Sequence, residues 1–230
     1  MESVLLSTAY FPPVIYFAHI IQSSEFIIET EENFQKQTYR NRCVILGANG
    51  TLNLTVPVQH NEPKIKISNL NISYHSNWQL IHFRAIESAY RNSPYYDYYI
   101  DEFKPFFHKK FNSLLELNSS ILNICLCLLN YKGKITFTKE FAKVQNNSDN
   151  DFRYSLSPKK AVSDYEFPEY HQVFIEKFGF IPNLSILDLI FNHGPESKEY
   201  LKSIKKMDRF DSVHSINPKT LIIKNQETKL

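Results

Sequence analysis

Two hydrophobic patterns follow each other at the start of the chain. Residues 4–11 form an apolar run that predicts a strand, and Pro12 and Pro13 end it. Residues 14–21 predict a short helix, and residues 25–29 predict a second strand. A strand, a helix and a strand in this order predict a β-α-β unit at the beginning of the fold.

A hairpin is the clearest local prediction. Residues 42–47 are mainly apolar, residues 48–50 contain the Asn-Gly pair of a tight turn, and from Leu52 to Val58 every second residue is apolar. We therefore expect a hairpin over residues 42–58, with one face of its second strand in the core. Pro57 cannot donate to a ladder, so this strand lies at a sheet edge or leaves the sheet there.

Helical spacing dominates the rest of the chain. Residues 77–90 place Trp78 and His82 on one inward face. Short strands are predicted at residues 64–73 and 135–138, and helices over residues 103–115 and from a cap at 118–120 to about residue 133. These patterns together predict an α/β fold with a mixed sheet, the hairpin and packed helices, and an α+β arrangement is the alternative.

Length and charge limit the function. With 230 residues, 43% of them hydrophobic, the chain is long enough for one large domain, expected over residues 1–200, and residues 201–230 read as a charged tail or peripheral element. A net charge of +2 with interspersed signs argues against a nucleic-acid partner. Dinucleotide-binding and P-loop motifs are absent, so any phosphate is held by side chains or a helix N-terminus.

The cysteines and the apolar runs point to the cytoplasm. Three cysteines fit a reducing compartment, and Cys125 and Cys127 have the surroundings of small buried residues. The chain starts without the basic region of a signal peptide, and no apolar run reaches the roughly 18 residues of a membrane span. No metal site is predicted because the histidines are scattered, whereas the cofactor and the oligomeric state stay open.

Basic residues gather directly before the hairpin. Arg40 and Arg42 stand two residues apart, so both point to the same side if the backbone is extended. With Lys36 and Asn41 they form a candidate site for a small anionic ligand such as a nucleotide sugar. The alternative is an exposed basic strand end that contacts only water.

Trp78 and His82 are candidates for the wall of a ligand pocket, in which the tryptophan stacks and the histidine transfers a proton. The alternative for His82 is a core histidine with a satisfied hydrogen bond. Tyr95 begins a run of tyrosines after a turn, and this run suits either a binding rim or packing between helices.

A carboxylate is predicted inside the last apolar helix. Asp188 lies on the apolar face of a helix that begins near residue 183, and a carboxylate in that position needs a partner. The candidates are Arg40, Arg42 and the cluster of residues 170–172. We expect Arg40, Arg42, His82 and Asp188 to converge on one cleft, in which one arginine stays free for a ligand.

Five blocks of the chain resemble the WbqC-like protein family, in order over about residues 8–200: YFPPVIYFAHIIQS, ENFQKQTYRNRCVILGANGTLNLTVPV, NWQLIHFRAIESAYRNSPYYDYY, DFRYSLSPKK and YHQVFIEKFGFIPNLSILDLIFNHGPES. The resemblance implies a bacterial protein of the kind encoded in surface-polysaccharide gene clusters. It also implies family-typical polar positions at Lys36, Arg40, Asn41, Arg42, Trp78, His82, Tyr90, Tyr170, Gln172, Ser185 and Asp188. Ile15 stands where the family often has glycine, and His19 lacks the H-x-G-H signature of nucleotidylyltransferases.

The sequence is compatible with three functions. The first is a transferase that adds an acyl or aminoacyl group to a nucleotide-linked amino sugar, with His82 and Asp188 as catalytic candidates and His82 as the general base. In that hypothesis Arg40 and Arg42 hold the phosphates, and tyrosines face the base or the sugar. The second is a non-catalytic binding or assembly protein for an anionic glycan precursor. The third, a metal-dependent hydrolase, is disfavoured by the histidine spacing.

Overall fold

A small parallel sheet lies at the N-terminal side of the molecule. The computed structural model describes residues 3–59, 64–143, 150–160 and 162–207. In it, β1 (Val4–Ser7), β2 (Glu25–Glu29) and β5 (Lys134–Phe137) pair in parallel in the order β1-β2-β5. α1 (Val14–Ile21) connects β1 to β2, which confirms the predicted β-α-β start.

The hairpin forms a second sheet. β3 (Arg42–Gly47) and β4 (Gly50–Thr55) pair antiparallel, and a third small sheet pairs β6 (Tyr165–Glu166) with β7 (Lys205–Lys206). The fold is therefore α/β, as predicted, with both parallel and antiparallel pairing. The hairpin was expected within one mixed sheet, and this was wrong, because the parallel and antiparallel pairings lie in separate sheets. Ala48 and Asn49 form the turn, and Gly50 follows it with φ of 108°, a conformation that glycine adopts at low cost.

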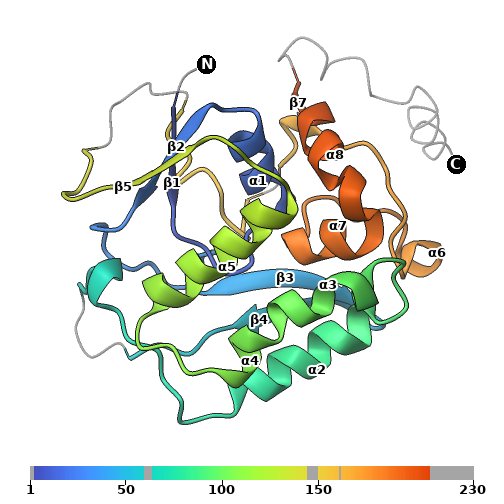
Figure 1. Cartoon of the computed structure of the whole chain (residues 1–230), viewed down its shortest axis with the longest axis horizontal. Helices are drawn as coiled ribbons and strands as arrows, with labels where there is room; N and C mark the ends of the chain where they lie inside the picture. The colour runs from blue at the N-terminus through green and yellow to red at the C-terminus, as the bar shows by residue number, and fades with distance from the viewer. Residues whose placement is uncertain (1–2, 60–63, 144–149, 161, 208–230) are drawn as a thin grey trace, which may run out of the picture.

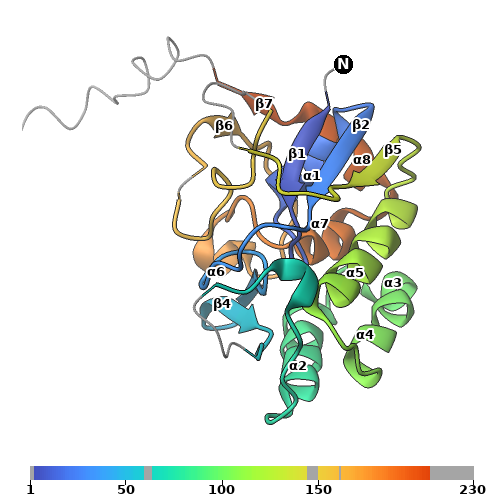
Figure 2. The ribbon, with the colours of Figure 1, turned by 90° about the vertical axis from the view of Figure 1, so that its left-hand side faces the viewer.

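Helices surround the hairpin (Figure 1). α2, α3 and α4 lie below it in this view, α5 crosses in front between the hairpin and the parallel sheet, and α7 and α8 lie to the right. Figure 2 shows the parallel sheet and α2 at opposite ends of the molecule. The bounds of these helices are Trp78–Tyr90 (α2), Tyr96–Phe103 (α3), Pro105–His108 (α4), Leu114–Leu128 (α5), Ile175–Phe178 (α6), Ile186–His193 (α7) and Ser197–Ser203 (α8).

Several local predictions were wrong. Residues 64–73 hold a short 3-10 helix, Ile67–Asn69, with isolated bridges on either side instead of strands. The helix expected over residues 103–115 is interrupted, because Pro105 begins α4 and Ser113 caps α5 by accepting a hydrogen bond from the Glu116 amide. The cap expected at residues 118–120 is wrong for the same reason, since these residues lie inside α5. Leu52 is 45% exposed, so the core face of β4 begins only at Leu54.

The predicted burial of the two neighbouring cysteines holds for one of them. Cys125 is buried, whereas Cys127 is exposed because the two stand two residues apart on α5 and face different sides of the helix.

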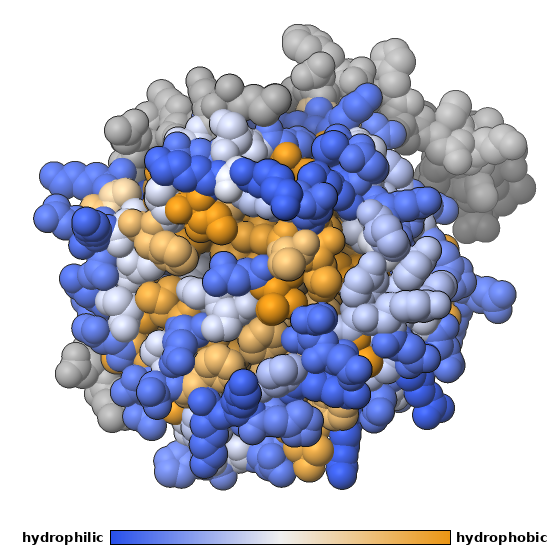
Figure 3. Space-filling view, viewed as in Figure 1, coloured by the Kyte–Doolittle hydropathy of each residue, from blue (hydrophilic) through white to orange (hydrophobic). Residues whose placement is uncertain are grey.

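Apolar side chains gather across the middle of the face in Figure 3, where α5 lies in the same view. The same helix thus contributes to the core and to an apolar part of the surface.

The end of the predicted domain packs into the molecule. α8 runs across residue 200, and Leu201 and Ile204 are buried. Residues 208–230, which make up most of the predicted tail, lie outside the described residues. The division at residue 200 stays a prediction.

Candidate functional site

The parallel strands end at one edge, here called the carboxyl edge, where ligands commonly bind in α/β folds. The chain leaves β1 there through a buried connection in which Phe11 has φ of 39° directly before Pro12. A bulky residue in this conformation is strained, and residues before proline avoid helical backbone angles. Strain of this kind often marks functional sites.

Protein groups occupy the N-terminus of α1. The Val14 amide donates to the Leu184 carbonyl at 2.9 Å, and the Ile15 amide donates to Oδ1 of Asn183 at the same distance. A phosphate held by this helix N-terminus, one of the sequence-based options, therefore has no free donors at these two amides.

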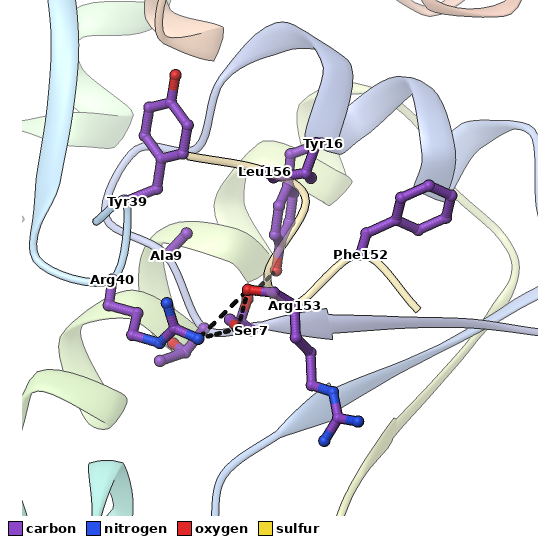
Figure 4. A pocket seen from close by; sticks show the side chains of 9 residues that line it. Ser7, Ala9, Tyr16, Tyr39, Arg40, Phe152, Arg153 and Leu156 are labelled. Atoms are coloured by element: carbon purple, nitrogen blue, oxygen red, sulfur yellow. Dashed lines mark hydrogen bonds between the residues drawn. The ribbon is translucent and has the colours of Figure 1, made fainter. Parts of the chain in front are cut away.

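Arg40 lies at the carboxyl edge beside Ser7 (Figure 4) and makes a buried ion pair with Glu32. Its Nε donates to Glu32 at 2.9 Å and its Nη2 donates to Glu32 at 2.5 Å, and both side chains are almost fully buried. Nη2 also donates to Oγ of Ser7 at 2.7 Å. A pair of this geometry is bidentate, and removal of one partner would leave an uncompensated buried charge.

The expected arginine fork does not form. Arg40 precedes β3, so the alternation of an extended strand does not apply to it, and its side chain turns inward while that of Arg42 lies half-exposed beside Thr55. Asn41 is buried and donates to the Val56 carbonyl at 2.9 Å, and Lys36 is exposed. The basic cluster is thus divided between the core and the surface.

Arg153 connects two segments at the carboxyl edge. Its guanidinium donates to Glu29 at 2.9 Å and to Asp151 at 2.9 and 2.6 Å, with a further bond to the Ala142 carbonyl at 2.7 Å. Residues 150–152 run beside β1, where the Leu5 amide donates to the Asn150 carbonyl. Arg153 therefore ties this segment to the end of β2. Sequence reasoning did not select Arg153, although it lies in one of the family blocks.

An inner cavity lies between these groups, with a volume of about 10 Å³, which is room for one water molecule. Figure 4 shows Arg40 and Ser7 on one side of it and Phe152 on the other, while the Arg153 side chain points away. Its lining residues are Ser7, Thr8, Ala9, Tyr16, Tyr39, Arg40, Phe152, Arg153 and Leu156. The cavity is too small for a nucleotide or a sugar.

His82 lies in a closed aromatic group. Its Nδ1 is 2.9 Å from the Tyr10 hydroxyl, and the Trp78 ring lies 5.1 Å away at a steep angle. Burial lowers the pKa of His82 to about 4, so the imidazole is neutral at pH 7. His82 is 4% exposed, which fits the alternative of a core histidine with a satisfied hydrogen bond.

Asp188 is paired, but with neutral groups. The Tyr170 hydroxyl donates to it at 2.6 Å and the Gln172 amide at 2.9 Å. Its predicted partnership with the residue 170–172 cluster is confirmed, and its pairing with an arginine is wrong. Burial raises the pKa of Asp188 to about 6, because hydrogen bonds from neutral donors offset the lost hydration incompletely.

The remaining predicted residues have structural contacts. Ser185 caps α7 by accepting from the Leu187 amide and donates to the Phe11 carbonyl. Tyr90 is buried with its ring centre 5.5 Å from that of Phe191, and burial and then the Asp188 charge raise its pKa well above the usual range. The ring of Tyr95 lies against Gly194, where a Cβ would come within 2.6 Å of it, so Tyr95 serves packing between helices.

The expected convergence on one cleft is not found. Arg40, His82 and Asp188 belong to separate hydrogen-bonded groups. Arg40 bonds Glu32 and Ser7, the last residue of β1, whereas His82 bonds Tyr10. Asp188 bonds Tyr170 and Gln172. We call these groups together the closed centre: Glu32, Arg40, Tyr10, His82, Tyr170, Gln172 and Asp188. Its polar groups face protein partners.

An open pocket of about 270 Å³ lies beside the inner cavity and shares Phe152 with it. His19 on α1 stacks on Phe152 with ring centres 3.7 Å apart, and its Nε2 is 3.4 Å from the Tyr165 hydroxyl. Burial, and then the positive charge of Lys206, lower the pKa of His19 to about 4. The pocket is lined by Ile15, Ala18, His19, Gln22, Asn150, Phe152, Tyr165, Ile204 and Lys206.

Sequence reasoning missed this pocket because its wall comes from separate segments. Tyr165 and Lys206 become neighbours only through the pairing of β6 with β7. Among the described residues, no three His, Cys, Asp or Glu side chains lie close enough to hold a metal ion. Within the same residues, no helix combines the length and apolar character needed to cross a membrane.

Comparisons with known proteins place the chain in a family. It is 25% identical over 228 residues to the uncharacterized protein Rv1507c of Mycobacterium tuberculosis, which covers 86% of this chain and 96% of that protein. No solved structure matches the chain significantly. The family model described as the WbqC-like protein family matches residues 8–161 and 157–200. The chain therefore belongs to the WbqC-like protein family.

Proposed function

We propose that the protein is a transferase that adds an acyl or aminoacyl group to a nucleotide-linked amino sugar bound in the open pocket. The observation that carries the proposal is the unprotonated His19 in the wall of this pocket, beside the Tyr165 hydroxyl and Lys206. A histidine with a strongly perturbed pKa in an open pocket is a candidate acid–base group. The surface-polysaccharide context that the family resemblance implies supports a sugar nucleotide as the substrate.

His19 has the role that the sequence suggested for His82. The sugar amine attacks the acyl carbon of an activated donor, such as a thioester or an acyl phosphate. The new N–C bond forms while the bond to the thiolate or phosphate leaving group breaks, and the neutral imidazole of His19 takes the proton of the amine on the ring nitrogen that Tyr165 does not contact. Tyr165 orients the imidazole through its hydroxyl, 3.4 Å from Nε2.

The other groups of the pocket suit an anionic, ring-containing ligand. Lys206 is exposed at the rim and attracts the phosphates, and Ile15, Ala18 and Phe152 offer apolar contact to a ring. Arg40 and Arg153 do not contact the ligand in this proposal. Their ion pairs fix the segment that carries Phe152 and the end of β1.

The test is a transfer assay with a panel of nucleotide-linked amino sugars and of acyl and aminoacyl donors. Removal of a general base reduces the rate by a factor of about 10² to 10⁴, so His19→Gln should lose transfer by that factor while it still binds the sugar nucleotide. His75→Gln, a change of the same kind at an exposed histidine outside the pocket, should keep the wild-type rate. Equal rates for His19→Gln and the wild type would refute the role of His19.

A non-catalytic binding protein is the second candidate. It is favoured by the closed centre, in which Arg40, His82 and Asp188 all have protein partners and no space for a substrate. Sugar-nucleotide binding in calorimetry, together with no product from any donor class, would favour this candidate over the transferase.

A further inference from the structure

A surface groove of about 410 Å³ lies apart from the open pocket and shares no lining residue with it. Extended segments that pair side by side form its floor: the Gln59 amide donates to the Asn71 carbonyl at 2.8 Å, and the Ile72 amide to the Asn112 carbonyl at 3.1 Å. The groove is lined by Gln59, Asn71, Ile72, Tyr74, Lys110, Phe111 and Asn112.

Tyr74 is held in one orientation in this groove. Its hydroxyl donates to the Phe111 carbonyl at 3.0 Å and accepts from the Phe111 amide at 2.7 Å. The Trp78 ring lies 6.0 Å from the Tyr74 ring and supports it from the core side, since Trp78 is 3% exposed. A ring that is fixed before a ligand arrives loses little conformational entropy on binding.

Exposed amides surround the ring. Gln59, Asn71 and Asn112 are exposed, and each amide offers two donor hydrogens and two acceptor lone pairs. Within the described part of the chain, Gln59 makes only a long bond of 3.4 Å to the Ile72 carbonyl, and the side chains of Asn71 and Asn112 make none. Donors and acceptors in such a mixture match sugar hydroxyls, which have both functions.

Lys110 adds one positive charge. Its Nζ lies over the Tyr74 ring, 5.4 Å from the ring centre. The Lys110 side chain is exposed, so it is free to turn off the ring face toward an anionic group when a ligand enters. Neither a histidine nor a carboxylate lines the groove, so these residues suit binding more than proton transfer. A ligand for this set has an apolar ring face, several hydroxyls and one anionic group.

We infer that the surface groove binds an acidic saccharide, whose sugar ring lies against Tyr74, whose hydroxyls pair with the amides and whose carboxylate pairs with Lys110. This inference goes beyond the proposed transfer reaction and does not depend on it. A nucleotide fits less well, because the groove is open and has one aromatic ring where a base gains most from two flanking faces.

Calorimetry on the full chain tests the inference with a glucuronate-containing oligosaccharide and its carboxyl-reduced, neutral counterpart. The acidic oligosaccharide should bind more tightly than the neutral one. Lys110→Gln should weaken acidic binding by up to about fivefold, the range of an exposed ion pair, and leave neutral binding unchanged. Lys109→Gln should change neither, because Lys109 is exposed but does not line the groove.

Tyr74→Ala should weaken both oligosaccharides at least about tenfold, as expected when a stacking ring is removed. If this variant does not fold, the comparison of Lys110→Gln with Lys109→Gln still tests whether Lys110 binds the carboxylate of the saccharide. Equal binding of the acidic and neutral oligosaccharides, an equal effect of the two lysine changes, or binding of inorganic phosphate as tight as that of the saccharide would each overturn the inference.

Discussion

Two histidines of this protein have similar pKa values and opposite surroundings. Burial lowers the pKa of both His82 and His19 to about 4. His82 lies in the closed centre, with Tyr10 on one ring nitrogen and 4% of the residue exposed, whereas His19 lines a pocket of about 270 Å³. A lowered pKa alone therefore does not identify a candidate catalytic histidine, and what separates His19 from His82 is the open space beside its ring.

The same contrast applies to the charged residues. In the closed centre, Arg40 forms an ion pair with Glu32. At the carboxyl edge, Arg153 forms ion pairs with Glu29 and Asp151. Lys206, at the rim of the open pocket, is exposed. Family-typical polar residues thus hold the scaffold together, and the residues that face the open pocket come from positions that sequence motifs did not emphasise.

The largest expected effect concerns the buried ion pair. Glu32→Ala leaves the Arg40 guanidinium buried without its carboxylate and should lower the free energy of unfolding by about 3 to 5 kcal/mol. Glu31→Ala is the matched control, because Glu31 pairs with the half-exposed Lys66 at the surface, and it should cost less than about 1 kcal/mol. Urea unfolding measures both, and equal losses would show that the Arg40 pair is not part of a closed centre.

Asp188 should make stability fall as the pH rises. Its pKa is raised from 3.8 to about 6 in the folded protein, so between these values the unfolded chain releases the proton first and the folded state loses stability. The loss should reach about 3 kcal/mol above pH 6. Asp188→Asn removes this titration, so the difference in unfolding free energy between wild type and variant should change from pH 4 to pH 7. A constant difference would contradict the burial of an ionisable, neutrally bonded Asp188.

The two cysteines on α5 also differ in burial, and the expected effect of this difference is the smallest of the three. Cys125 is buried, and burial raises the pKa of its thiol, whereas Cys127 is exposed. A thiol reagent should label one cysteine rapidly in the native protein, and Cys127→Ser should abolish this fast phase with little change in stability. Rapid labelling that persists in Cys127→Ser would show that the α5 core face opens.

Local elements were predictable because their signals lie within a few residues. α1, β2 and β3 have the predicted bounds, since runs of apolar residues bounded by Pro12-Pro13 and by Asn49-Gly50 determine them. Leu52 was misassigned because alternation shows which residues share a face and not how far the core extends along it.

The candidate site was predictable only in part. Asp188 was recognised as an inward carboxylate from helical spacing alone, and its partners at Tyr170 and Gln172 were among those expected. Arg40 was expected to bind a ligand but instead pairs with Glu32. The local sequence pattern does not show that Glu32 lies close enough to pair with it. The open pocket depends on the packing of α1 against residues 150–152, β6 and β7, which no single stretch of sequence contains.

The proposed function places the anionic ligand in the open pocket and not at the basic cluster before the hairpin. The most direct measurement is the Kd of the best-binding nucleotide sugar for wild type, Lys206→Glu and Arg42→Glu by calorimetry. Neither residue is buried, so charge reversal at either leaves the core intact. Lys206→Glu should weaken binding by about tenfold, through lost attraction and added repulsion, and Arg42→Glu should stay within about twofold of wild type. Weak binding in Arg42→Glu with unchanged binding in Lys206→Glu would instead place the ligand at the basic cluster before the hairpin.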